Sequence, residues 1–515
     1  MSAVMAFDIL DQHPGELPAL HAAGQTATRA ELKKAAQCAA AFMHELGLRR
    51  GDTVAVWIPD GAIWLQLLFG AAQLGVLMVP VSTRLKLSEA QHIVATAGAR
   101  MLIVPTKFLD FDYSGAGRAM RGSLPALVHV IEVPAEGSFQ WLDCEPHRDF
   151  SGHDADALCT FSTSGTTGKP KLAVHTQGGL AAHARNAGHV TEIRPGDAML
   201  CALPLYGVLG FVSAVAALAA GGTCVFLPVF KADAAAAAIE RYRVTHFYGS
   251  DGMFDMVFGA QGHSFATWRC GGFAEFAGLG KKVIEQAWSR WGLRLSGIYG
   301  MSECLALMAI RDTAGDARQR GMAGGTPIAP GMSFRIVDPG TGLPKEDGEQ
   351  GELQLRGYNV MKGYLNNPDS TADAFTPDGW LKTGDLAYAK GNEFFYLARL
   401  KDSLRLKGYL VDPTEVEDFL CRHPGVAAAQ VVGVHQEGEG DVAVAFVRPS
   451  AQPAAESDLL AYCKGGIAGF KVPRRIVPID EFPQSQGPNG VKILKNVLRE
   501  IAKRHLESSP STTAQ

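Results

Sequence analysis

Phe161-Ser-Thr-Ser-Gly-Thr-Thr-Gly-Lys-Pro-Lys171 is the stretch that says most about the fold, because it gathers five hydroxyl side chains, two glycines and two lysines within eleven residues. The apolar run 157–161 leads into it and predicts a short buried strand. Glycines let backbone N–H groups approach a ligand, and lysines add charge that attracts a polyphosphate. Gly165 and Gly168 are closer together than the glycines of a P-loop. The residues alone therefore leave open a phosphate-binding loop or a flexible surface turn.

Length and composition indicate a large folded protein without a nucleic-acid partner. The 515 residues are 47% hydrophobic, which is enough for a large core. The net charge is −4 and no basic run appears, so binding to nucleic acid is not expected. The nine cysteines form no C-x-x-C pair, which predicts neither a zinc site nor a disulfide framework. A cytoplasmic location is expected from this cysteine usage, and a signal peptide is not.

An uncharged stretch covers residues 198–230 and is long enough to cross a lipid bilayer. Prolines and glycines interrupt it, among them Pro204 and the pair Gly221-Gly222. This punctuation predicts a buried helix over 208–220 and a strand over 223–227. Stable insertion into a membrane is therefore not expected.

The first part of the chain alternates between helical and extended patterns, which is typical of an α/β sheet. A capping box, Thr28-x-x-Glu31, opens the first predicted helix. Residues 108–152 predict an irregular connection. Helices are predicted over 28–46, 62–74 and 88–96, and strands over 53–58, 76–81 and 100–104.

The later part predicts two further units. Residues 323–398 contain short extended segments separated by Gly, Pro and Asp, which predicts a β-rich subdomain. A charged segment at 399–402 predicts a domain boundary. We therefore expect an α/β protein with a large N-terminal domain over 1–399, which includes that subdomain, and a small α+β domain over 400–515 that ends in a disordered tail.

Further motifs follow the hydroxyl-rich stretch in order. They are Tyr299-Gly-Met-Ser-Glu303, Gly379-Trp-Leu-Lys-Thr-Gly-Asp-Leu386, Arg399-Leu-Lys-Asp402, Lys407-Gly-Tyr409, Val411-Asp-Pro-Thr-Glu415, Phe470-Lys-Val-Pro-Arg474 and Val491-Lys-Ile-Leu-Lys495. This ordered set resembles the adenylate-forming superfamily of acyl- and aryl-CoA synthetases, adenylation domains and luciferases. The resemblance covers nearly the whole chain, and the set in order is far more specific than any single motif.

The resemblance implies a reaction in two steps. A carboxylate reacts with ATP to give an acyl-adenylate and pyrophosphate, and a thiol, usually that of coenzyme A, then displaces AMP. Because the first step brings two anions together, groups that place positive charge there are expected to matter most. The resemblance thus implies ATP, Mg²⁺ and coenzyme A, with a small hydrophobic carboxylic acid as substrate. It leaves a homodimer open.

By motif position, the resemblance assigns the nucleotide-binding residues. Tyr299 is expected against adenine with Gly272 and Phe273 on the other side, although the family often has Ala in place of Phe273. A core aromatic at a strand end is the alternative for Tyr299. The β- and γ-phosphates are expected at Thr163, Ser164, Gly165, Thr166, Thr167, Gly168, Lys169 and Lys171. The other residues expected beside the nucleotide are Gly300, Met301 and Ser302, the last of these at the α-phosphate.

Two acidic residues receive separate roles from the resemblance. Glu303 is expected to bind Mg²⁺, which prefers carboxylate oxygen, and a helix-capping glutamate is the alternative. Asp385 is expected to accept hydrogen bonds from both ribose hydroxyls, and Arg399 is expected to reach the ribose as well. An ordinary turn aspartate is the alternative for Asp385.

Lys492 is expected to be the adenylation lysine, which bridges the substrate carboxylate and the α-phosphate. Together with Glu303 and Ser302 it forms the expected catalytic set. The family usually has Gly directly before this lysine, whereas this chain has Val491. Two alternatives stay open: Lys492 is a solvated residue at the start of an amphipathic helix, or Lys495 takes the role.

Adenylation and thioester formation require two active sites from one chain, and the resemblance implies a rotating C-terminal domain. Lys401 occupies the expected hinge position. Rotation is expected to replace Lys492 with Lys407, Gly408 and Tyr409, which would line a tunnel for the pantetheine arm of coenzyme A. An ordinary charged linker is the alternative.

The acid-binding pocket is expected to be mainly apolar, which favours a hydrophobic acid. The pair Tyr206-Gly207 resembles that of benzoate-CoA ligases, and the small Gly300 removes the plug expected of acetate-specific members. The residues do not decide between an aryl and a medium-chain acid. By motif position the pocket is lined by Tyr206, Gly207, Val208, Tyr248, Gly271, Ile298 and Gly300.

Three functions stay open on this sequence. The first is an ATP-dependent carboxylic acid–CoA ligase that acts through an acyl-adenylate. The second is a stand-alone adenylation enzyme that loads a separate carrier protein. The third is a catalytically silent nucleotide-binding relative, which Val491 and Phe273 keep open, whereas retention of Glu303, Asp385 and Lys492 favours an enzyme.

Overall fold

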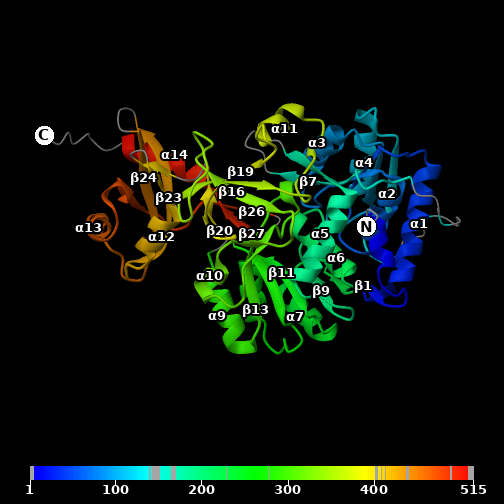
Figure 1. Cartoon of the computed structure of the whole chain (residues 1–515), viewed down its shortest axis with the longest axis horizontal. Helices are drawn as coiled ribbons and strands as arrows, with labels where there is room; N and C mark the ends of the chain where they lie inside the picture. The colour runs from blue at the N-terminus through cyan, green and yellow to red at the C-terminus, as the bar shows by residue number, and fades with distance from the viewer. Residues whose placement is uncertain are drawn as a thin grey trace. The chain divides into compact units, whose positions relative to one another are not determined.

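The computed structural model divides the chain into two compact units (Figure 1). The first contains Met1–Ser333 and Leu355–Leu381, and the second contains Phe334–Gln354 and Lys382–Gln515. The predicted class, mixed α/β with a large N-terminal part and a small C-terminal part, is confirmed. The domain boundary predicted at 399 marks where the C-terminal domain is expected to rotate relative to the preceding domain, and this boundary stays a prediction. The structure describes residues 5–137, 141, 146, 151–163, 170–227, 229–275, 278–400, 404–406, 409–411, 413–436, 440–487 and 490–507.

One sheet of the first unit has the strand order β18-β8-β7-β4-β3-β5-β6. Its strands are β3 Thr53–Val56, β4 Leu77–Pro80, β5 Met101–Pro105, β6 His129–Val133, β7 Ala157–Thr163, β8 Lys171–Thr176 and β18 Gly363–Tyr364. The helices in the same part of the sequence as these strands are η1 Ala6–Asp11, α1 Arg29–Glu45, α2 Ala62–Leu74, α3 Leu87–Ala97 and α4 Tyr113–Ser123.

Local sequence accounts for the first helix. The hydroxyl group of Thr28 accepts a hydrogen bond from the Glu31 N–H, and the Glu31 carboxylate accepts one from the Thr28 N–H at 2.7 Å. This is the predicted capping box, and it satisfies backbone donors that the first turn of a helix leaves unpaired.

The irregular connection predicted over 108–152 is wrong for its first part, because α4 and β6 form there. Asp112 caps α4 by accepting a hydrogen bond from the Gly115 N–H at 2.8 Å. The helix is rich in glycine, which weakens its helical signal, and Gly117 packs directly against Val130 of β6. Packing onto the sheet, rather than local propensity, therefore stabilises this segment.

A second sheet runs through the first unit in the order β15-β14-β13-β12-β11-β9-β10-β1-β2, and β9 to β13 are mutually parallel where they pair. The strands are β1 Pro18–Ala22, β2 Gln25–Thr28, β9 Ala198–Cys201, β10 Thr223–Phe226, β11 His246–Ser250, β12 Cys270–Ala274, β13 Arg294–Tyr299, β14 Ala309–Ile310 and β15 Gly324–Pro327. The helices that follow in this unit are α5 Gln177–Val190, α6 Val208–Ala219, α7 Ala232–Arg241, α8 Asp251–Gly259, α9 Gly280–Trp291, η2 Ser302–Cys304, α10 Ala317–Gly321 and α11 Pro368–Ala374.

The pair α5 and α6 connects the two sheets. The two helices pack against each other, α5 contacts β7 and β8 of one sheet, and α6 contacts β9, β10 and β11 of the other. The uncharged stretch 198–230 thus forms β9, α6 and β10 inside the core, as predicted. Among the described residues, no helix is long and apolar enough to cross a membrane.

The second unit contains shorter sheets. The strands β16 Ser333–Val337, β17 Gln350–Arg356, β19 Leu381–Lys390 and β20 Glu393–Arg399 are neighbours in that order. Another sheet has the order β22-β21-β24-β23 with β25 beside β24, and it comprises β21 Leu404–Leu406, β22 Tyr409–Val411, β23 Val426–Gln436, β24 Gly440–Pro449 and β25 Arg475–Pro478. The remaining elements are the ladder β26 Gln484–Gly487 with β27 Gly490–Ile493, and the helices α12 Pro413–Cys421, α13 Glu456–Gly466, η3 Gly469–Lys471 and α14 Lys495–Glu507.

Candidate functional site

The hydroxyl-rich stretch joins two antiparallel strands. In the register of β7 and β8, Thr163 lies directly opposite Lys171, so the two ends of the loop are neighbours. The predicted phosphate-binding residues Ser164, Gly165, Thr166, Thr167, Gly168 and Lys169 lie outside the described residues.

The segment that carries Glu303 lies beside this loop mouth. The Ser302 hydroxyl donates to the carbonyl oxygen of Ser162 on β7 at 3.3 Å. Glu303 is buried, and its Oε1 accepts a hydrogen bond from the Tyr364 hydroxyl at 2.8 Å. Lys171 Nζ lies 4.9 Å from the centre of the same Tyr364 ring. Of the predicted phosphate-binding residues, the structure thus brings Lys171 near Glu303, with Tyr364 between the two.

Tyr364 has no counterpart among the residues predicted from sequence. It lies in the two-residue strand β18, which no periodic pattern marks, and it reaches the site because it pairs with Ala173 of β8. Only that register, set by tertiary structure, reveals its position.

The surroundings of Glu303 fit Mg²⁺. Among the described residues, no cluster of three or more His, Cys, Asp or Glu side chains is arranged to hold a metal. A single carboxylate is the expected protein contribution when substrate phosphates and water supply the other ligands of Mg²⁺. The nearby Lys171 adds positive charge for those phosphates.

The strand register separates the residues predicted around adenine. Successive side chains of a strand point to opposite faces, which places Phe273 and Tyr299 on one face and Gly272 with Tyr248 and Ile298 on the other. Phe273 is fully buried, with its ring 6.0 Å from that of Phe254. The Phe273 side chain thus packs in the core, and its position beside adenine stays a prediction.

Gly300 has a different reason to be glycine from the one expected. A Cβ there would lie 2.4 Å from the Cα of Ala306 and 2.8 Å from the backbone nitrogen of Leu307. The absent side chain makes room for this backbone, and the role of Gly300 in the acid pocket stays a prediction. Met301, which follows, is the N-cap residue of η2.

Three predicted acid-binding residues, Tyr206, Gly207 and Ile298, lie at or beyond the carboxyl ends of parallel strands, where ligands of open α/β sheets bind. Tyr248 lies in the middle of β11, and Gly271 lies near the amino end of β12. Tyr206 and Gly207 follow β9, and Gly207 precedes Val208, the first residue of α6. A Cβ on Gly272 would contact both Ile298 and Tyr248, so these three share one face. Gly271 is on the opposite face, toward Leu295, and does not join them.

Asp60 is a further polar residue at this end that sequence reasoning missed. Its Oδ1 accepts a hydrogen bond from the Leu205 N–H at 2.9 Å, next to Tyr206. Desolvation of the carboxyl group raises the pKa of Asp60 from 3.8 to about 7.

In the second unit, the two predicted ribose residues are cross-strand partners. Asp385 of β19 faces Arg399 of β20, and Arg399 Nη1 lies 3.0 Å from Asp385 Oδ1. The Asp385 side chain is 2% exposed, whereas that of Arg399 is 45% exposed. The hydroxyl group of Thr383, also on β19, donates to the Leu353 carbonyl oxygen and accepts from the Asp385 N–H at 3.0 Å.

Lys492 lies in β27, opposite Ser485 of β26, and not at the start of a helix. The rival, Lys495, is the first residue of α14, and its Nζ forms an ion pair with Glu417 Oε1 at 3.0 Å. Tyr409 belongs to β22. Lys401, Lys407 and Gly408 lie outside the described residues.

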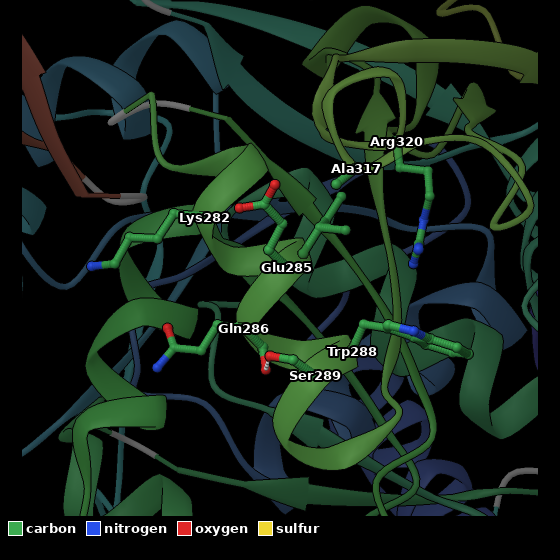
Figure 2. Close-up of a pocket in the computed structure, with 8 residues that line it drawn as sticks. Lys282, Glu285, Gln286, Trp288, Ser289, Ala317 and Arg320 are labelled. Carbon is green, nitrogen blue, oxygen red and sulfur yellow. Dashed lines mark hydrogen bonds between the residues drawn. The ribbon is translucent and has the colours of Figure 1, made fainter.

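A separate groove is lined by α9 and α10 of the first unit. Figure 2 shows Lys282, Glu285, Gln286, Trp288, Ser289, Ala317 and Arg320 around it. Trp288 is 59% exposed there. No residue predicted to bind the nucleotide, the acid or coenzyme A lines this groove.

The α/β fold and the juxtaposition of the loop mouth with Glu303 are those of an adenylate-forming enzyme. Residues 7–365 match the AMP-binding enzyme family, and residues 415–487 match the AMP-binding enzyme C-terminal domain. The chain therefore belongs to the AMP-binding enzyme family.

Similar proteins support the same class. A feruloyl-CoA synthase from Amycolatopsis is 33% identical over 92% of this chain and 94% of its own length. A mitochondrial medium-chain acyl-CoA ligase from Danio rerio is 30% identical over 93% of this chain and 84% of its own length. The crystal structure of ATP-bound MatB from Rhodopseudomonas palustris is 26% identical, with a TM-score of 0.84 over 97% of this chain and 99% of that one. The protein is an AMP-forming acid–thiol ligase, and ATP and coenzyme A are substrates of the acyl-CoA synthetases to which it is similar.

Proposed function

We propose that the protein joins a hydrophobic aryl or medium-chain carboxylic acid to coenzyme A, with Mg²⁺ bound at Glu303. The observation that carries this proposal is the contact of Lys171, Tyr364 and Glu303 at the mouth of the hydroxyl-rich loop. The buried side chains of Tyr248 in β11 and Ile298 in β13 support a hydrophobic acid. The names of two relatives refer to ferulate and to medium-chain acids, and both classes are hydrophobic.

In the first step, a carboxylate oxygen of the acid attacks the α-phosphorus of ATP, and the bond to the pyrophosphate oxygen breaks. Lys171 and the loop orient the β- and γ-phosphates, and Ser302 donates a hydrogen bond to the α-phosphate. Lys492 neutralises the charge between the carboxylate and the α-phosphate. The metal supplies charge neutralisation on the phosphates when it is bound.

The second step uses other residues of the C-terminal part. The thiolate of coenzyme A attacks the acyl carbon, and AMP leaves with the electron pair of the anhydride bond. Asp385 and Arg399 hold the ribose through both steps. Rotation about Lys401 replaces Lys492 with residues 407–409, which line the thiol path.

An acid panel tests this proposal. The full chain is incubated with ATP and Mg²⁺ and with aryl acids, medium-chain acids, acetate or amino acids, and pyrophosphate release and ATP–pyrophosphate exchange are measured with and without coenzyme A. We expect turnover with hydrophobic acids and acyl-CoA only when coenzyme A is present. Glu303→Gln, which removes the carboxylate proposed to bind Mg²⁺, should lose ATP–pyrophosphate exchange.

Each outcome of the panel selects one function. Acyl-adenylate formation without transfer to coenzyme A would favour loading of a carrier protein. Background exchange for every acid, in protein that still binds ATP, would leave a silent nucleotide-binding relative. Cytoplasmic location and a homodimer stay predictions.

A further inference from the structure

We propose that His175 and His183 are positioning residues that hold the segment 302–307, and with it Glu303, in the geometry that the nucleotide site requires. The metal role of Glu303 in this inference rests on the proposed function. Neither histidine belongs to the motifs that define the site. Both reach the segment through backbone carbonyl groups.

Four backbone carbonyl groups of this segment accept hydrogen bonds from residues outside it. His175 Nε2 lies 2.7 Å from the Ser302 oxygen, and the Met361 N–H donates to the Glu303 oxygen at 2.8 Å. Asn359 Nδ2 donates to the Cys304 oxygen at 2.7 Å, and His183 Nε2 lies 2.8 Å from the Ala306 oxygen. Four different donors therefore fix the backbone around a single acidic side chain.

The segment needs such support because its backbone is strained. Leu305, Ala306 and Leu307 have φ values of 57°, 34° and 44°, in the left-handed region that favours glycine. Such a conformation is unfavourable for residues other than glycine and persists only when the surroundings impose it. The hydrogen bonds from His183 and Asn359 act at this strained turn.

The two histidines suit the task because they remain neutral donors. His175 is 2% exposed and His183 is 1% exposed, and desolvation lowers the pKa of each from 6.5 to about 4. A neutral imidazole whose Nε2 faces a carbonyl oxygen carries its proton on that nitrogen. His175 also lies on β8, the strand that begins at Lys171, so one strand positions both the loop exit and the Glu303 segment.

The chain offers a matched control. His246 is fully buried, its Nε2 lies 2.9 Å from the carbonyl oxygen of Thr191, and desolvation lowers its pKa to about 4. It makes the same kind of bond at the amino end of β11, away from residues 302–307. His246→Ala therefore reports the cost of losing a buried histidine without disturbing the segment.

The experiment compares His175→Ala, His183→Ala and His246→Ala in the full chain. Hydrogen–deuterium exchange is measured on peptides that cover residues 299–310, together with thermal stability, ATP binding at varied Mg²⁺ and KM for ATP and for the acid. We expect faster exchange in 299–310 and at least a tenfold rise in the KM for ATP for the first two variants, with the acid KM unchanged. His246→Ala should lower the melting temperature without either effect.

The inference is overturned if the three variants differ only in melting temperature, because His175 and His183 would then be ordinary core residues. If an alanine variant does not fold, the Gln variant at that position, which keeps a donor, should restore slow exchange and the ATP KM. Failure to do so also overturns the inference. Hydrogen–deuterium exchange and ATP binding can be measured without turnover. These two measurements therefore decide this inference even if the protein activates no acid.

Discussion

Two lysines close together in sequence have different structural settings. Lys495 pairs with Glu417, whose Oε1 also accepts a hydrogen bond from the Val431 N–H at 2.8 Å, so Lys495 ties α14 to α12 and β23. Lys492 lies on β27, where its backbone is opposite Ser485 of β26. This division favours Lys492 for the adenylation step.

We predict that Lys492→Ala abolishes ATP–pyrophosphate exchange, because the charge between the two anions is no longer neutralised. Thioester formation from synthetic acyl-adenylate should be retained. Lys495→Ala, the matched variant, should lower the free energy of unfolding by about 1–3 kcal/mol, because it leaves the partly buried Glu417 without its cation. Loss of exchange in Lys495→Ala with normal stability would reverse the assignment.

The raised pKa of Asp60 predicts that the stability of the folded protein depends on pH. Its pKa is raised from 3.8 to about 7, so the stability that the protonated carboxyl group contributes is present below about pH 4 and is lost as the pH rises to 7. The groups that interact with it, Cys201 and Tyr206, have pKa values that are themselves raised by burial, and they stay neutral.

We therefore expect Asp60→Asn to raise the free energy of unfolding at pH 8 by about 1–3 kcal/mol. The asparagine oxygen can still accept from the Leu205 N–H, so the hydrogen bond is kept. The gain should disappear at pH 4, where the wild-type carboxyl group is protonated. Denaturant unfolding at the two pH values measures this, and an equal gain at both would show that ionisation is not the cause.

At the scale of elements, the turn after β13 depends on a close backbone approach. A Cβ at residue 300 would overlap the backbone of Ala306, which belongs to the strained part of the 302–307 segment. Because only backbone atoms are in the way, no side-chain rotation can relieve the overlap.

We predict that Gly300→Ala displaces the 302–307 segment and lowers the free energy of unfolding by about 1–3 kcal/mol. The KM for ATP should rise because Glu303 moves with the turn. Gly122→Ala in α4, where no atom lies within 4 Å of the added Cβ, should be neutral or slightly stabilising. Equal behaviour of the two variants in denaturant unfolding and ATP kinetics would contradict the packing argument.

At the scale of the whole molecule, two reactions must share one chain. The proposed rotation about Lys401 uses residues 407–409 only after the adenylate has formed. A mutation confined to that segment should therefore separate the two half-reactions.

We predict that Gly408→Leu leaves ATP–pyrophosphate exchange within about twofold of wild type and slows thioester formation at least tenfold, because the larger side chain obstructs the thiol path. Exchange and acyl-CoA formation are measured on the same preparation. Gly465→Ala, in α13 with no atom within 4 Å of the added Cβ, serves as the control. An equal loss of both half-reactions would remove the tunnel from the proposal.

Local patterns predicted most elements of this protein. The capping box at Thr28 and the helix over 62–74 need only neighbouring residues, and both appear as expected. The glycine-rich α4 was missed because its stability comes from packing on β6, which no local pattern expresses. Motif position does not state which face of a strand a side chain occupies, and only the strand register places Phe273 on the face of Tyr299 and not on that of Gly272.

The sequence by itself determined the order of the motifs, the alternation of helices and strands and the enzyme class, because these depend on residue type and local spacing. Only the tertiary structure decided that Tyr364 lies between Lys171 and Glu303, and that His175, Asn359 and His183 hold the strained turn beside it. Those contacts join residues at least 55 positions apart in the sequence, and strand register and helix packing set them.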